Sequence, residues 1–131
     1  MTQIWYPDFD DIMSLFVKLQ QKDSELKDAN LMNENAIKSI LNKVKYGLPF
    51  KKTSFMEKTA ILWHDITREH HFSNGNKRMG FWAMSTFLEM NGYHLKKIHD
   101  DLIVALCVEI AEGKQNIEKI TVWLMNNSEK I

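Results

Sequence analysis

Residues 76–90 have the sequence NKRMGFWAMSTFLEM. After a short polar start, apolar residues occupy nearly every side of a helix with 3.6 residues per turn. A helix that is apolar all round is buried inside its domain. Asn91-Gly92 follows and predicts the end of the helix, because glycine readily takes the left-handed backbone of a C-terminal cap. This stretch therefore predicts a buried central helix, around which the remaining chain packs.

The flanking sequence predicts further helices on both sides of this one. Apolar residues recur at helical spacing over about 8–27, 34–46, 54–70, 100–113 and 116–126. Start signals precede several of them: Pro7, Asn33, and a capping box formed by Ser54 and Glu57. Glycine and proline make up only about 5% of the chain, too little for a many-stranded fold. The prediction is an all-α bundle of about six helices, with one short β-hairpin allowed near residues 46–53.

Composition narrows the class of protein. The 131 residues predict a single domain over 1–131, with a core over about 33–126 and an N-terminal helix over about 8–27. Seventeen basic and 17 acidic residues give a formal charge of zero, so we expect no direct nucleic-acid binding. The single cysteine, Cys107, has no internal disulfide partner. No apolar run is long enough to span a membrane, and the acidic start is unlike a signal peptide, so we expect a cytoplasmic protein.

Residues 70–78, HHFSNGNKR, form a polar loop that leads into the central helix. A helix N-terminus presents unpaired backbone N–H groups, and Gly75 lets a ligand approach the backbone closely. Lys77 and Arg78 oppose the helix dipole, and a bound anion would explain their placement. His70 at the rim can accept a proton from a hydroxyl near neutral pH. The loop therefore predicts phosphoryl or nucleotidyl transfer to a hydroxyl group.

The same nine residues resemble the signature loop of the Fic/Doc family. The match is to the Doc (death-on-curing) branch, whose pattern is His-x-Phe-x-Asp/Asn-Ala/Gly-Asn-Lys-Arg. The resemblance implies that ATP and Mg²⁺ are used to modify a protein hydroxyl. The roles it implies are a general base at His70, an apolar loop anchor at Phe72, a metal-ligand position at Asn74, an anion cradle at Gly75, Asn76 and Lys77, and phosphate binding by Arg78 and Arg68.

The family also has a flap that aligns the target peptide by strand addition. The resemblance places this target-docking flap between the second and third predicted helices. Its residues are Tyr46, Gly47, Leu48, Pro49, Phe50, Lys51 and Lys52.

Two departures from the Fic pattern bear on the choice between the family's reactions, and a third bears on metal binding. Lys77 stands where the adenylyl-transferring branch has a second glycine, and Phe81 stands where that branch has a distal arginine. Both departures favour a kinase of the Doc type over an adenylyltransferase. Asn74 is an amide where a carboxylate would hold Mg²⁺ better. The resemblance then predicts transfer of a phosphoryl group from ATP to Ser or Thr of a translation factor such as elongation factor Tu, with AMP transfer and a catalytically degenerate binding domain as alternatives.

Two further patterns bear on metal binding and on inhibition. His64-Asp65 resembles the dipeptide of HD phosphohydrolases, but without well-spaced partners it indicates a half-buried histidine rather than a metal ligand. The inhibitory motif of the family, Ser/Thr-x-x-x-Glu-Gly/Asn, has its nearest counterpart at residues 53–58, where Lys58 replaces the final Gly/Asn. The resemblance therefore implies restraint by an antitoxin partner in trans.

Overall fold

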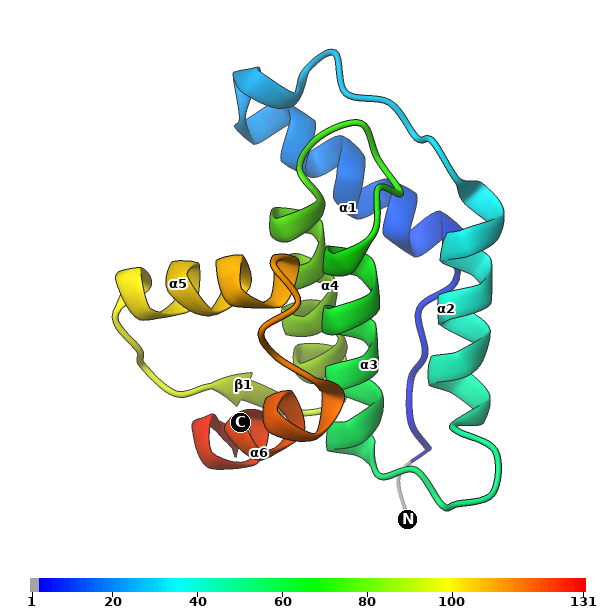
Figure 1. Cartoon of the computed structure of the whole chain (residues 1–131), viewed down its shortest axis with the longest axis vertical. Helices are drawn as coiled ribbons and strands as arrows, with labels where there is room; N and C mark the ends of the chain where they lie inside the picture. The colour runs from blue at the N-terminus through cyan, green and yellow to red at the C-terminus, as the bar shows by residue number, and fades with distance from the viewer. Residues whose placement is uncertain (1–2) are drawn as a thin grey trace.

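The computed structural model describes residues 3–131 and is mostly helical, as the sequence predicts (Figure 1). Met1 and Thr2, which the predicted domain includes, lie outside the described residues. The elements are α1 (Phe9–Lys22), the 3₁₀ turn η1 (Ser24–Leu26), α2 (Glu34–Tyr46), α3 (Phe55–Arg68), α4 (Asn76–Met90), β1 (Tyr93–Leu95), α5 (Asp100–Ala111), α6 (Ile117–Asn127) and β2 (Ser128–Lys130).

Local capping sets most helix starts where the sequence predicts them. The side chain of Asn33 accepts a hydrogen bond from the N–H of Ala36 at the start of α2. Ser54 and Glu57 form the predicted capping box of α3, with the Glu57 N–H donating to Ser54 Oγ at 3.1 Å. Because these caps satisfy backbone donors within a few residues, the sequence alone can locate them.

Two boundaries differ from the prediction. The first helix ends at Lys22 rather than Lys27, because Asp23 accepts a hydrogen bond from the N–H of Glu25 and opens the separate turn η1. Helix α5 is capped by His99, whose Nδ1 accepts from the N–H of Asp101 at 3.2 Å, rather than by an aspartate.

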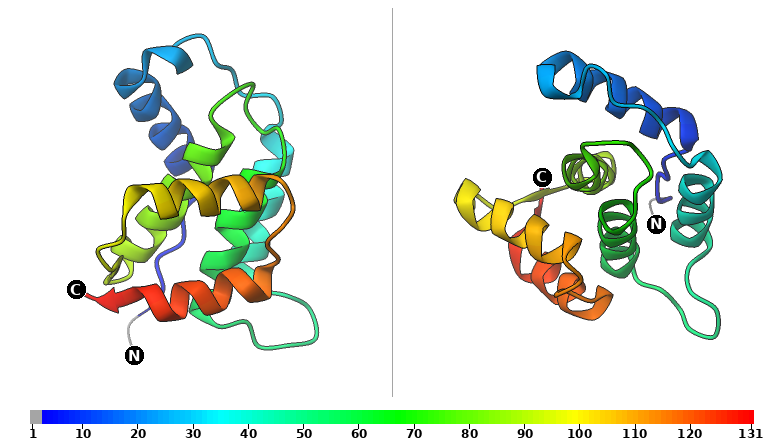
Figure 2. Two further views of the ribbon diagram at one scale, coloured as in Figure 1. Left: turned by 60° about the vertical axis from the view of Figure 1, so that its left-hand side comes forward. Right: turned by 45° about the horizontal axis from the view of Figure 1, so that its top comes forward.

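The helix at the centre of the packing is α3, not the predicted α4. Helix α3 packs against α2, α4, α5 and α6, and Figure 2 shows it enclosed by them. Helix α4 packs against α3, α1 and α5 but keeps Phe81 and Trp82 partly exposed. An apolar sequence shows that a helix can be buried on every side, but not how many neighbours reach it.

Helices α3 and α4 form the most extensive interface in the domain. Gly80 lies against α3, and a Cβ atom there would be 2.0 Å from Thr67 Oγ1 and 3.1 Å from the Trp63 carbonyl oxygen. Trp63 itself is fully buried between α3, α5 and α6. Its ring meets the ring of Trp123 edge-on, with the ring centroids 5.5 Å apart. The missing side chain at Gly80 thus fixes how closely the two helices that flank the polar loop approach each other.

The small sheet is not the predicted hairpin. Strands β1 and β2 pair antiparallel with Tyr93 opposite Lys130, so the sheet joins the segment after α4 to the C-terminal end. Residues 46–53 contain no strand: Gly47 has φ +80°, and the Leu48 N–H is held by Thr53 Oγ1 at 2.8 Å. The turn closes on itself and has no strand partner.

The two loops that flank α3 lie at opposite ends of it (Figure 1). A 14-residue helix is about 21 Å long, which separates residues 47–53 from residues 69–75 by that span. Within residues 3–131, no helix is both long enough and apolar enough to cross a bilayer.

Replacing Gly80 by Ala should lower the free energy of unfolding by about 1–3 kcal/mol, because the new methyl group overlaps Thr67 Oγ1. Urea unfolding measures this loss. The double variant Gly80→Ala, Thr67→Ala removes the overlapping hydroxyl and should recover part of it. Equal stability of the wild type and the single variant would show that the interface is looser than described.

Candidate functional site

The polar loop between α3 and α4 is fixed by Phe72, the residue predicted as its anchor. The Phe72 ring is fully buried and stacks on Phe16 of α1 with ring centroids 4.2 Å apart. Both ends of the Asn76 side-chain amide bind the Phe72 backbone: Phe72 N–H donates to Asn76 Oδ1 at 3.1 Å, and Asn76 Nδ2 donates to the Phe72 carbonyl at 2.9 Å. A single side chain thereby satisfies both backbone groups at the middle of the loop.

The other edge of the loop pairs with the segment between η1 and α2. Leu31 and Phe72 form an isolated antiparallel bridge. The Met32 N–H donates to the His71 carbonyl at 2.8 Å, and the Ser73 N–H donates to the Asn30 carbonyl at 2.9 Å. The loop is therefore held on both sides, which fixes the backbone on which His70 stands.

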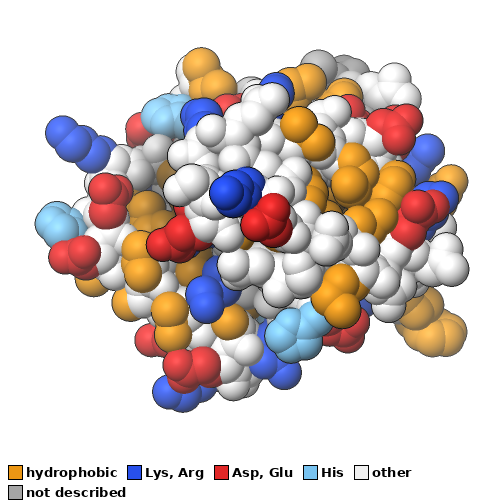
Figure 3. Space-filling model, turned by 90° about the horizontal axis from the view of Figure 1, so that it is seen from above, with side chains coloured by type: hydrophobic (Ala, Val, Ile, Leu, Met, Phe, Trp, Pro, Cys, Tyr) orange, Lys and Arg blue, Asp and Glu red, His pale blue; other side chains and the backbone are white. Residues whose placement is uncertain are grey.

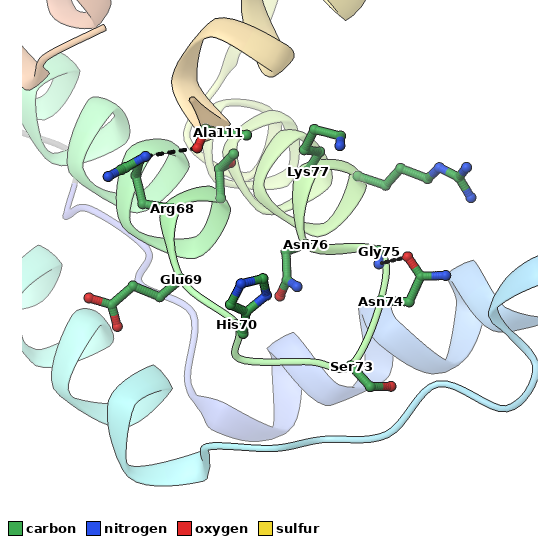
Figure 4. Close-up of a pocket in the computed structure, with 11 residues that line it drawn as sticks. Arg68, Glu69, His70, Ser73, Asn74, Gly75, Asn76, Lys77 and Ala111 are labelled. Atoms are coloured by element: carbon green, nitrogen blue, oxygen red, sulfur yellow. Dashed lines mark hydrogen bonds between the residues drawn. The ribbon is translucent and has the colours of Figure 1, made fainter. Parts of the chain in front are cut away.

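A cavity of about 340 Å³ opens beside this loop (Figure 4). Every residue predicted to bind the nucleotide lines this cavity, and so does the predicted base, His70. Its lining consists of Thr67, Arg68, Glu69, His70, Ser73, Asn74, Gly75, Asn76, Lys77, Arg78 and Ala111. The C-terminus of α3, the N-terminus of α4 and the C-terminus of α5 converge here.

The N-terminus of α4 faces this cavity without a cap. Gly75 takes the left-handed conformation with φ +84° and provides no side-chain cap, and the first backbone bond of the helix is the Met79 N–H to the Gly75 carbonyl at 2.9 Å. No group within residues 3–131 accepts from the N–H groups of Asn76, Lys77 and Arg78. These three donors and the positive end of the helix dipole form a ready anion seat.

The two adjacent histidines have opposite environments. His70 is exposed in the cavity, and its ring makes no hydrogen bond to any described residue, while Glu69 points away from it (Figure 4). His71 is 1% exposed, and its Nε2 lies 2.9 Å from the Asp65 carbonyl oxygen. A general base must be accessible to the group from which it accepts a proton. His70 therefore suits the role of base, whereas His71 is a buried residue of the core.

The three cationic side chains of the site, Arg68, Arg78 and Lys77, differ in the protein groups that they contact. Arg68 donates to the Ala111 carbonyl at 2.7 Å, and its guanidinium packs against Gly113, where a Cβ would lie 3.0 Å from Nη1. Arg78 forms ion pairs with Asp23 and, at 3.6 Å, with Glu25. Lys77 pairs with no carboxylate in the described part of the chain.

The ion pairs of Arg78 explain its position at the start of α4 without a bound anion. Asp23 and Glu25 already offset the unfavourable interaction of Arg78 with the helix dipole. Only Lys77 is left without a counter-charge there. Figure 3, which looks onto this end of the molecule, shows acidic and basic side chains interspersed over its surface.

The cavity does not form a protein site for Mg²⁺. The amide oxygen of Asn74, the predicted metal position, accepts a hydrogen bond from the Gly75 N–H at 2.8 Å. Residues 3–131 contain no cluster of three His, Cys, Asp or Glu side chains that could hold a metal ion. Mg²⁺ needs several oxygen ligands, and one amide oxygen that already accepts a hydrogen bond does not provide such a site.

His64 and Asp65 belong to an ion-pair cluster on the surface of α3. His64 Nδ1 lies 2.7 Å from one Asp65 oxygen, and Lys43 Nζ of α2 lies 2.7 Å from the other. Burial alone would raise the pKa of Asp65, but the hydrogen bonds from His64 and Lys43 outweigh it and lower the pKa below its usual value. The cluster thus joins α2 to α3, in keeping with the half-buried histidine that the sequence indicates.

The predicted target-docking flap needs correction. None of the residues 46–52 lines the cavity, because this turn lies at the far end of α3. Lys51 pairs with Glu57 of the α3 capping box at 2.7 Å, and Phe50 is fully exposed. The segment beside the active loop is instead Asn30–Met32. Spacing along the chain does not show at which end of a helix pair a connection lies, so the sequence could not place this turn relative to the cavity.

Comparison with known proteins agrees with this geometry. A family model described as "Fic/DOC family" matches residues 5–88, more than half of the chain. No match was found among curated proteins. Members of that family are typically transferases that use nucleotide substrates and act on protein targets. The chain belongs to the Fic/DOC family.

Several residues at the site escaped sequence reasoning. Asp23 and Glu25 reach Arg78 from η1, and Ala111 and Gly113 reach Arg68 from the end of α5. They lie more than 40 residues from their partners in sequence, and no local pattern marks them. The Asn30–Met32 pairing is equally non-local, and no polar/apolar alternation marks it.

Replacing Asn76 by Asp should loosen the loop, because the carboxylate keeps the acceptor for the Phe72 N–H but faces the Phe72 carbonyl without a donor. The loss should be about 1–3 kcal/mol in local stability. Amide hydrogen exchange at residues 70–76 measures it. The exposed Asn126, replaced by Asp, gives the matched charge control. Unchanged protection of the loop in Asn76→Asp would contradict the bracing role.

Proposed function

We propose that this protein is a Doc-type kinase that transfers the γ-phosphoryl group of ATP to a Ser or Thr hydroxyl of a target protein. The observation that carries the proposal is the placement of an accessible imidazole, His70, opposite three unpaired N–H groups of α4. The helix N-terminus supplies a seat for phosphate oxygens, and Lys77 adds an uncompensated positive charge. Membership of the Fic/DOC family supports nucleotide as the substrate.

In the proposed reaction, the target hydroxyl oxygen attacks the γ-phosphorus as His70 accepts the hydroxyl proton. A bond forms between that oxygen and phosphorus, the bond from phosphorus to the β–γ bridging oxygen breaks, and ADP leaves. The N–H groups of Asn76, Lys77 and Arg78 stabilise the charge on the phosphoryl oxygens. The ion pairs of Arg78 with Asp23 and Glu25 offset part of its positive charge, which weakens its attraction for phosphate.

The choice of phosphoryl over AMP transfer is supported by two side chains. Lys77 occupies the first turn of α4, where the adenylyl-transferring branch has glycine, and fills space beside the backbone seat. Phe81 provides no positive charge where that branch carries its distal arginine. AMP transfer remains the second candidate, because the anion seat and His70 would serve both reactions.

The target chain is proposed to dock along residues 30–32. In a non-hydrogen-bonded antiparallel pair such as Leu31–Phe72, the backbone groups of Leu31 point away from the loop. No described residue bonds to the Leu31 N–H. An extended peptide added at this edge would pair with residues 30–32 on the side opposite Ser73, so that residues 30–32 would lie between the peptide and the loop that carries His70.

By resemblance, the proposed target is a translation factor such as elongation factor Tu, and the proposed restraint is an antitoxin in trans. Neither follows from the contacts described above. Both enter through the Doc-like loop sequence.

The chemistry can be tested by incubating the protein with ATP, Mg²⁺ and purified elongation factor Tu or a cell extract, then measuring intact masses. We expect a phosphate-sized increment that falls at least about 100-fold in His70→Ala, because a general base contributes on that scale. Lys77→Gly should introduce an AMP-sized product. An AMP increment with the wild type would favour adenylyl transfer instead, and nucleotide binding without any increment would indicate a degenerate domain.

The docking edge can be tested with Leu31→Pro against Leu31→Ala. Both variants lose the leucine side chain, but only proline removes the outward N–H, a change that edge strands tolerate. We expect Leu31→Pro to raise the KM for the protein target several-fold relative to Leu31→Ala, with the KM for ATP unchanged. The same kinetics for both variants would place the docking edge elsewhere. Phe50→Ala, in the distant turn, should leave both constants unaltered.

A further inference from the structure

The turn that joins α2 to α3 carries the two most exposed aromatic side chains of residues 3–131. Phe50 is fully exposed, and Tyr46, the last residue of α2, is 75% exposed. Figure 2 shows the turn standing out beyond the two helices that it joins. A single exposed apolar side chain is common on protein surfaces, but two aromatic rings at one projecting turn make that turn a candidate contact surface.

The backbone of the turn directs Phe50 into the solvent. Gly47 has φ +80°, and the Leu48 N–H donates to Thr53 Oγ1 at 2.8 Å, which closes the base of the turn. Leu48 packs against the core, whereas Phe50 takes φ +71°, a conformation that bulky side chains rarely adopt. Strained backbone of this kind is concentrated at functional sites. The closed turn thus buries one apolar side chain and presents the next.

The chain around this turn is strongly basic. Residues 38–58 contain six lysines and a single acidic residue, Glu57, although the whole chain is formally neutral. Lys51 pairs with Glu57 at 2.7 Å. Lys45 and Lys52 are exposed and pair with no carboxylate of the described residues, and Lys45 Nζ lies 5.5 Å from the centroid of the Tyr46 ring. Positive charge and aromatic rings therefore occur together at this end of the molecule.

Helix stability explains only part of this arrangement. Lysines in the last turn of a helix interact favourably with its dipole, which is a sufficient reason for Lys45 at the end of α2. It does not account for Lys52, which lies beyond the helix, or for the exposed ring of Phe50. We give the name basic–aromatic tip to the five residues Lys45, Tyr46, Phe50, Lys51 and Lys52.

The charge and shape of the basic–aromatic tip suit an anionic lipid surface. Aromatic rings favour the headgroup layer of a bilayer, and lysines are attracted to its anionic lipids. A side chain that stands out completely can enter this soft layer. An extended peptide or a single-stranded nucleic acid is bound instead at strand edges or in grooves. The turn contains no strand, and its Leu48 N–H is already bonded within the turn.

We propose that the basic–aromatic tip docks this protein on an anionic phospholipid surface, with the ring of Phe50 in the headgroup layer and the lysines against the anionic headgroups. The contact is peripheral and reversible, because one projecting turn supplies only part of what stable anchoring needs. His70 lies about 21 Å away, at the other end of α3. Its cavity therefore stays clear of the lipid and open to soluble ligands.

Co-sedimentation of the full chain with lipid vesicles tests the docking. We expect binding to phosphatidylcholine vesicles that contain about 30% phosphatidylserine, weaker binding as salt is added, and at least about 10-fold weaker binding to pure phosphatidylcholine. The double variant Lys45→Glu, Lys52→Glu should bind the anionic vesicles at least about 25-fold more weakly, because each reversal replaces attraction by repulsion. Phe50→Ala should bind them several-fold more weakly.

The matched charge control is Lys18→Glu, Lys27→Glu, which changes the net charge equally at exposed lysines of α1 and of the chain after η1. We expect this control to bind like the wild type. No binding of the wild type to anionic vesicles, or equal binding by the tip variant and the control, overturns the proposal. All four lysines are exposed, so the comparison does not depend on a buried contact.

Insertion of the ring can be measured separately with Phe50→Trp. We expect brominated phosphatidylcholine in the anionic vesicles to quench the added indole emission relative to the wild type. Val17→Trp, at a 47% exposed position of α1, should show no added quenching. Vesicle binding without quenching of Phe50→Trp would contradict insertion of the tip.

Soluble polyanions distinguish a lipid surface from other acidic partners. Poly(U) RNA and polyglutamate are tested with the same variants. Binding of either polymer that is lost in Lys45→Glu, Lys52→Glu, with no binding to anionic vesicles, would assign the tip to a nucleic acid or an acidic protein and overturn the lipid proposal. The docking does not rest on the proposed reaction, since vesicle binding is measured without ATP or a protein target.

Discussion

The site depends on the double hydrogen bond between the Asn76 side-chain amide and the backbone of Phe72. This contact closes the loop on its inner side, while the pairing with Asn30 and Met32 closes it on the outer side. The buried ring of Phe72, stacked on Phe16, anchors the middle. A polar loop with its central backbone groups satisfied in this way can hold His70 at one place without burying it, and it leaves the start of α4 open.

The Asn76 side chain is bound to the Phe72 backbone, and the two arginines are bound to other parts of the protein. The groups left for an anion are therefore the backbone N–H groups at the start of α4 and the side chain of Lys77. Arg68 joins α3 to the end of α5, and Arg78 joins α4 to η1. Two of the three cations therefore hold the walls of the cavity together. Asp23 and Glu25 offset part of the charge of Arg78, so Lys77 carries the positive charge of this end of α4 that no carboxylate of the described residues balances.

The sequence located the helices, their Asn33 and Ser54 caps, and the loop, since each depends on residues a few positions apart. It also predicted residues that share one cavity, because six of them lie within 70–78 and Arg68 is two residues before His70. It misplaced the centre of the bundle, and it could not show that the 46–52 turn lies away from the cavity. Whether α3 or α4 has more neighbours depends on how α5 and α6 return over the bundle, and capping signals carry no information about that.

The sequence by itself determined the all-α class, the loop chemistry and the likeness to the Fic/Doc signature, because hydrophobic periodicity, caps and a nine-residue motif are local properties of the chain. Only the tertiary structure decided that the 46–52 turn lies about one helix length from His70, that residues 30–32 lie beside it, and that Arg78 meets Asp23. These contacts join segments distant in sequence, so they depend on how the helices pack and not on any local pattern.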